Sequence, residues 1–124
     1  MKLTATTRFV QGVVILDLSG RIALGEGSDS LRDLIAKLVS SGNKKILLNL
    51  CNVNFIDSSG LGELVGAFTK LRGAGGELKL VNLTKRVRQL LQITKLYTVF
   101  DITDDENVSI KSFWPPIFPL PLPA

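Results

Sequence analysis

Two neighbouring serines near the middle of the chain are the residues best placed to do chemistry. Ser58 and Ser59 follow Asp57, directly after an apolar stretch, and a helical pattern begins beyond them. Side chains of Ser and Asp commonly cap helices, because their oxygens accept hydrogen bonds from the free N–H groups of the first turn. One interpretation is therefore that Asp57 or Ser58 is an ordinary cap. The other is that a serine is a chemical handle, since the positive end of a helix dipole tolerates a phosphate.

Catalysis by either serine is the weakest hypothesis. A nucleophilic serine needs an activating base and an oxyanion site, and the chain contains no histidine. That absence excludes Ser-His and Cys-His catalysis, His-zinc sites and histidine pH switches within the chain. Lys44 and Lys45 are expected at the far end of the preceding strand, and the glycine-rich run 73–76 lacks the Lys-Ser/Thr of a P-loop. We therefore expect no enzyme, no cofactor and no metal site.

Composition narrows the class of protein further. The 124 residues suit one domain, and the net charge of +4 lacks the clustering typical of direct nucleic-acid binding. The single cysteine, Cys51, excludes a disulfide framework and is expected to be a small core residue in a reducing compartment. The amino-terminal segment has no signal-peptide pattern, and no apolar run is long enough to insert into a membrane. We expect a cytoplasmic protein.

Apolar periodicity predicts strands alternating with helices. Strands are expected at 3–10, 13–19, 46–50, 77–81 and 98–102, with a hairpin at Gln11-Gly12. Ser28 is the expected cap of a first helix, the Asp57 turn opens a second that runs to about Arg72, and Thr84 caps a third. A short helix at about 104–113 would be the fourth. The fold class expected is α/β: a mixed, mostly parallel five-stranded sheet with an N-terminal hairpin and three to four helices.

The end of the chain differs in composition from the rest. All five prolines lie in 114–124, among several apolar side chains. We therefore expect one domain over 1–113 and a proline-rich apolar tail over 114–124. Two interpretations stay open: an unstructured appendage, or a segment that packs on its own domain or on a second copy in a homodimer.

The second predicted helix carries two different stripes. One is apolar and must face the sheet; it consists of Leu61, Leu64, Val65, Phe68 and Leu71. The other is turned roughly 140° away and consists of Ser59, Gly62, Gly66 and Thr69. A glycine inside a helix costs about 1 kcal/mol relative to alanine. Two glycines on a solvent-facing stripe indicate close approach by another protein, or relief of crowding against a loop of the same domain.

The run from Asn54 to Gly62, after the apolar strand, resembles the signature of the STAS domain, specifically the bacterial anti-sigma factor antagonists. Three further segments are similar to the family in the same register: 18–22, 75–80 and 87–91. The resemblance covers about residues 3–111. One departure is the end of the third strand, Asn49-Leu50-Cys51, where relatives commonly have Asp-Leu-Ser.

The resemblance implies a phosphorylation switch. The second serine of the motif, Ser59, would be phosphorylated by an anti-sigma factor that is itself a serine kinase; Ser58 is the second choice. The unphosphorylated protein would capture that anti-sigma factor and so release a sigma factor for transcription. Phosphorylation would end the binding, and a PP2C-type phosphatase would reset it. The alternative is a STAS subunit of a larger signalling or lipid-transport assembly.

A partner-binding surface follows from the same resemblance and from the glycine stripe. Its expected members are Asp57, Ser58, Ser59, Gly60, Gly62, Glu63 and Gly66, with Arg21 and Glu26 on the loop after the second strand. A basic cluster, Lys85, Arg86 and Arg88, crowds the start of the third helix, where cations oppose the dipole. Two interpretations of this cluster stay open: a contact for an acidic partner patch, or a solvated face.

Overall fold

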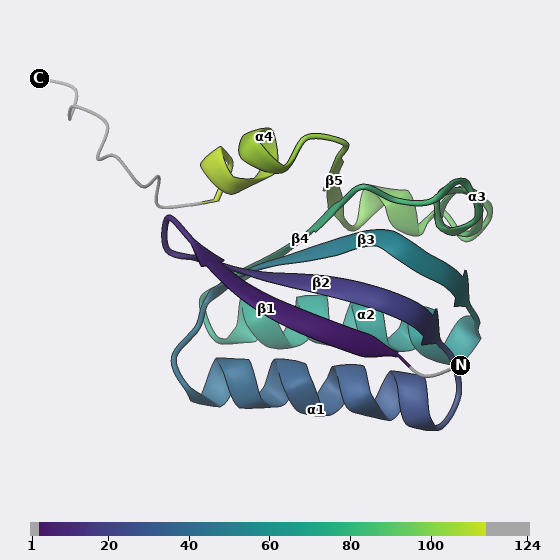
Figure 1. Cartoon of the computed structure of the whole chain (residues 1–124), viewed down its shortest axis with the longest axis horizontal. Helices are drawn as coiled ribbons and strands as arrows, with labels where there is room; N and C mark the ends of the chain where they lie inside the picture. Colours follow the sequence, from purple (N-terminus) through teal and green to yellow (C-terminus); the bar gives the residue numbers. More distant parts are fainter. Residues whose placement is uncertain (1–2, 114–124) are drawn as a thin grey trace, which may run out of the picture.

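The computed structural model describes residues 3–113, and they form a five-stranded sheet flanked by helices (Figure 1). The strands are β1 (Thr4–Val10), β2 (Val13–Ile22), β3 (Lys45–Ile56), β4 (Glu77–Val81) and β5 (Asp101–Thr103). The helices are α1 (Glu26–Ser40), α2 (Ser58–Gly73), α3 (Lys85–Ile93), the 3-10 turn η1 (Leu96–Thr98) and α4 (Glu106–Lys111). The strand order is β1-β2-β3-β4-β5; β1 pairs antiparallel with β2 and the other pairs are parallel. The expected fold class is confirmed.

Helices cover both faces of the central strands. In Figure 1, α1 and α2 lie side by side on one face of the sheet, and α4 lies on the other. The larger core cluster joins Leu16 and Leu48 to α1 and α2. A smaller cluster joins Ile15 and Leu47 to Ile110 of α4 and to Phe113 just after that helix. Alternate residues of β2 therefore enter opposite cores. This arrangement explains why its apolar run is nearly continuous.

Two strands, β2 and β3, are longer than the sequence pattern predicts, and their paired ends lie at the Asp57 turn. β2 continues to Ile22 and β3 to Ile56, although the expected ends were 19 and 50. Their pairing continues through register shifts between Asp17 and Ser19 and between Gly20 and Arg21. Such irregularities let polar and glycine residues stay in a strand whose apolar alternation is broken. Cys51, expected in the core, is exposed in this irregular part of β3.

Other helix and strand boundaries also differ from the expected ones. The expected strand at 98–102 is replaced by η1 and by β5, which pairs with β4 only from Asp101 to Thr103. Helix α1 begins after Gly25, so Ser28 is a buried helical residue and not the expected cap. By contrast, Glu77–Val81 and the Thr84 cap are confirmed, and α4 lies inside the expected range 104–113. The predicted tail, 114–124, lies outside the described residues. Within 3–113, no helix is long and apolar enough to cross a membrane.

Candidate functional site

The strand-to-helix turn is organised by the carboxylate of Asp57. Its Oδ1 accepts the N–H of Gly60 at 2.9 Å, and its Oδ2 accepts the N–H of Leu24 at 3.0 Å. The hydrogen bond from Leu24, followed by that from Gly60, lowers the pKa of Asp57 below its ordinary value. Asp57 thus caps α2 and ties the loop before α1 to it. The capping hypothesis is confirmed for Asp57, whereas Ser58 is the first helical residue.

Gly60 allows α2 to start against the end of β2. A Cβ at this position would lie 2.0 Å from the backbone oxygen of Ile22 and 2.7 Å from the side chain of Ile56. Real Cβ atoms do not approach oxygen so closely, so only glycine fits here. Gly60 therefore has an internal reason to be glycine, whatever a partner requires.

The two glycines further along α2 have no such reason. A Cβ on Gly62 or Gly66 would meet nothing within 4 Å. The hypothesis that they relieve crowding against this domain is therefore wrong for the described residues. Both are exposed with Thr69, Ser59 is half-buried at one end of the stripe, and Ser58 is exposed. The opposite stripe packs on the sheet as expected, with Leu61, Leu64 and Leu71 buried and Val65 and Phe68 half-buried; Ala67, which the pattern did not include, is buried as well.

Helix α1 borders the serine turn with acidic side chains and one paired arginine. Glu63, one turn after Ser59, accepts hydrogen bonds from Arg32 Nε at 3.0 Å and Nη2 at 2.8 Å. The same guanidinium contacts Asp29 at 3.0 Å. Glu26, expected in a loop, is the first residue of α1. Sequence reasoning did not find Arg32, because only the packing of α1 on α2 brings it to Glu63.

A basic and aromatic group borders the turn on the sheet side. Arg21, also expected in a loop, lies in β2 and pairs in register with Phe55 of β3. The guanidinium carbon of Arg21 is 4.2 Å from the centre of the Phe55 ring, and that of Arg86 is 5.5 Å from it. Leu24 is 79% exposed in the loop between these two borders. Sequence reasoning missed Leu24 and Phe55; an apolar residue directly before the loop glycine Gly25 was the available signal for Leu24.

Asn49, the departure from the family pattern, belongs to a different network. Its side-chain amide donates to Asp17 Oδ1 at 2.8 Å, and its oxygen accepts the N–H of Cys51 at 3.2 Å. Asp17 in turn is held by Arg8, whose hydrogen bonds lower the pKa of the Asp17 carboxyl. Arg8 also bonds Glu106 of α4. These hydrogen bonds join β1, β2, β3 and α4, and none of them reaches α2.

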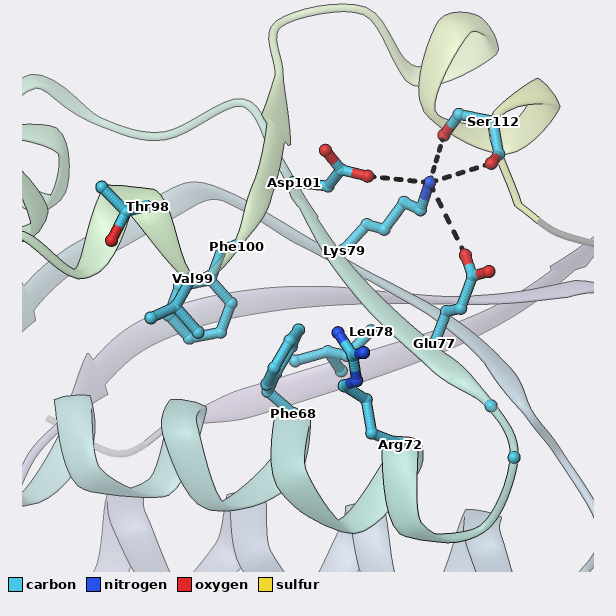
Figure 2. Close-up of a pocket in the computed structure, with 12 residues that line it drawn as sticks. Phe68, Arg72, Glu77, Leu78, Lys79, Thr98, Val99, Phe100, Asp101 and Ser112 are labelled. Atoms are coloured by element: carbon cyan, nitrogen blue, oxygen red, sulfur yellow. Dashed lines mark hydrogen bonds and ion pairs between the residues drawn. The ribbon is translucent and has the colours of Figure 1, made fainter.

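A cleft of about 600 Å³ lies at the other end of α2 (Figure 2). Lys79 dominates its polar wall; its ammonium group is 3.0 Å from Asp101 and donates to the carbonyl and hydroxyl oxygens of Ser112 at 2.9 and 2.8 Å. Ser59 and Arg72, which lines the cleft, are about 20 Å apart along the helix. The ammonium group of Lys79 is therefore satisfied within the domain. Among residues 3–113, no group of three acidic or cysteine side chains is placed to hold a metal ion.

Comparison with known proteins assigns the family. The STAS domain model matches residues 4–108. An anti-sigma F factor antagonist of Paenibacillus polymyxa is 32% identical over 97 residues, covering 77% of this chain and 82% of that protein. A Thermotoga maritima structure, described as a candidate anti-sigma factor antagonist, has a TM-score of 0.79 and 26% identity, covering 85% of this chain and 90% of that one.

The Bacillus protein SpoIIAA, solved in unphosphorylated and phosphorylated forms, shares the fold. Each form has a TM-score of 0.66 and 21% identity, and each match covers 85% of this chain. The match covers 92% of the unphosphorylated SpoIIAA chain and 96% of the phosphorylated one. The sheet order, the Asp57-capped turn and these matches lead to one conclusion. The chain belongs to the STAS domain family, and the Paenibacillus relative and SpoIIAA are named anti-sigma factor antagonists.

Proposed function

We propose that this protein is an anti-sigma factor antagonist that binds its anti-sigma factor through the Asp57 turn and the exposed stripe of α2. The observation that supports this most directly is the open space over Gly62 and Gly66 beside Ser59. Two helical glycines weaken α2 without any internal packing reason. A partner backbone or side chain that approaches this stripe closely would supply the reason.

Phosphorylation of Ser59 by the same anti-sigma factor, acting as a serine kinase, would end the binding. A phosphoserine brings about −1.5 to −2 charges at neutral pH. Asp57 already occupies the N–H of Gly60, and Arg32 is engaged by Glu63 and Asp29, so the new charge would join an acidic border. Like charges in a desolvated contact oppose association. A PP2C-type phosphatase would restore the binding form, and the released sigma factor would direct transcription.

The test combines phosphate mapping with binding. The protein is incubated with serine-kinase anti-sigma factors and ATP, and phosphate is located by mass spectrometry. We expect label on Ser59, loss of binding for Ser59→Asp, and binding without release for Ser59→Ala. Ser58→Ala is the matched control, because it removes a neighbouring exposed hydroxyl and should still be labelled and released. Label on another residue, or full binding by Ser59→Asp, would contradict the proposal.

A further inference from the structure

We propose that Arg21 and Arg86, held over the ring of Phe55, form a binding site for an acidic segment of the partner. This inference rests on the proposed function, because it takes the partner to be the anti-sigma factor. It adds to that function a second contact outside α2, with a stated charge. The contact would select partners that present carboxylates at this position.

Three elements converge on this site. Arg21 comes from β2, Phe55 is its register neighbour on β3, and Arg86 comes from the first turn of α3. The two guanidinium carbons lie 4.2 and 5.5 Å from the centre of one half-buried ring, while both arginines are exposed. A guanidinium over an aromatic face is held in a preferred orientation. The donors are therefore partly organised before any partner arrives, which lowers the entropic cost of binding.

The charges of this site are not compensated within residues 3–113. Arg8, Arg32 and Arg88 each bond at least one carboxylate, whereas neither Arg21 nor Arg86 has a hydrogen bond or ion pair to one among the described residues. Lys85 adds a further cation at the start of α3, where positive charge opposes the helix dipole. Like charges are thus gathered without an internal acid, and an incoming carboxylate would relieve their repulsion.

The position of the site joins it to the serine turn. The register pair after Arg21 and Phe55 is Ile22 and Ile56, and the backbone oxygen of Ile22 is the atom against which Gly60 packs. Figure 1 shows the ends of β2 and β3 and the start of α2 at the same end of the molecule. A partner that docks on Ser59 and α2 therefore lies beside this site. The opposite border of the serine turn, at α1, is acidic. The two sides of the turn therefore carry opposite charge.

A protein carboxylate fits the site better than a nucleic acid does. Arginine forks bind carboxylates with two parallel hydrogen bonds, which suits a short acidic segment. Nucleic-acid binding relies on longer tracks of cations and on several stacking aromatics. Here there are only three cations, Arg21, Arg86 and Lys85, and one ring, Phe55, which is too small a set for such a track.

The first experiment uses the full chain and an acetylated hexaglutamate peptide as the probe. Arginine Nε–Hε resonances are followed by NMR during the titration at low salt. We expect the resonances of Arg21 and Arg86 to shift and then to recover as salt is added. Arg72 is the matched control, because it also lies over a ring, Phe68 at 5.5 Å, without a carboxylate partner among the described residues. Equal shifts at Arg72, or stronger binding of a hexathymidylate oligonucleotide at Arg21 and Arg86, would overturn the proposal.

The second experiment measures binding to the anti-sigma factor that phosphorylates the protein. We expect Arg21→Glu/Arg86→Glu to weaken binding by at least about tenfold, with Arg72→Glu close to the unmodified protein. Arg21→Gln/Arg86→Gln provides a milder variant, and thermal unfolding shows that each variant is folded. If Ser59→Asp abolishes binding while both double variants bind normally, this inference is overturned and the proposed function stands. If Ser59 variants have no effect, the proposed function fails, and the peptide titration decides the inference.

Discussion

At the scale of single residues, Asp57 connects fold and function. It caps α2 through Gly60 and holds the loop before α1 through Leu24. We expect Asp57→Ala to lower the free energy of unfolding by about 1–2 kcal/mol, the upper part of the range for a lost helix cap. Urea unfolding measures the change. Asp33→Ala is the control, because Asp33 is an exposed acid of α1 outside the turn.

The same carboxylate gives a signed pH dependence. The pKa of Asp57 is lower in the folded protein, so its stabilising contribution is present above its ordinary pKa and is lost as pH falls through the lowered one. We therefore expect the stability difference between the natural protein and Asp57→Ala to be full at pH 7 and to shrink below about pH 4. A difference that stays constant from pH 7 to pH 2 would contradict this assignment.

At the scale of elements, helix α2 separates glycines that serve the fold from glycines that do not. We expect Gly62→Ala and Gly66→Ala each to raise the free energy of unfolding by about 0.5–1 kcal/mol, because alanine is the better helix former and the space is open. Both should weaken binding of the anti-sigma factor. Chemical denaturation and calorimetry measure the two effects.

Gly60→Ala is the matched contrast on the same helix. Its new methyl group would meet the oxygen of Ile22, so we expect a loss of about 2–3 kcal/mol in stability.

The binding measurement decides the role of the open stripe. Stabilised Gly62 and Gly66 variants that bind as well as the natural protein would show that the open stripe is not a docking surface.

At the scale of the whole molecule, two networks attach α4 to the sheet. Lys79 bonds the oxygens of Ser112 directly after the helix, and Arg8 bonds Glu106 in its first turn (Figure 2 shows the Lys79 contacts). Lys79 also lies 5.0 Å from the centre of the Phe113 ring. The second core of the molecule depends on this attachment, because Ile110 and Phe113 close it.

We expect Lys79→Met to loosen α4 and to lower the free energy of unfolding by about 1–3 kcal/mol, since acceptors at Ser112 lose their donor. Amide hydrogen exchange should increase over Glu106–Lys111 and stay slow in α2. Lys111→Met is the control for loss of a lysine, because Lys111 is exposed at the end of the same helix. Unchanged exchange in α4 would show that its packing alone holds it.

The sequence by itself determined the parts of the protein that local chemistry controls. Strand β4, the caps Asp57 and Thr84 and the two stripes of α2 depend on residue type and spacing over a few positions, and all were predictable. The serine motif also indicated the family. Strand ends were less predictable, because β2 and β3 extend through bulges that only pairing between distant segments maintains.

The tertiary structure alone decided which residues meet around the turn. Arg32 reaches Glu63 because α1 packs beside α2, and Arg86 reaches Phe55 because α3 packs against β3. Asn49 faces Asp17 because the two residues are register partners on β3 and β2. The tertiary structure also showed that Gly60 meets a backbone oxygen, while Gly62 and Gly66 face open space. Each contact joins residues more than 15 positions apart or depends on free volume, which a local pattern does not encode.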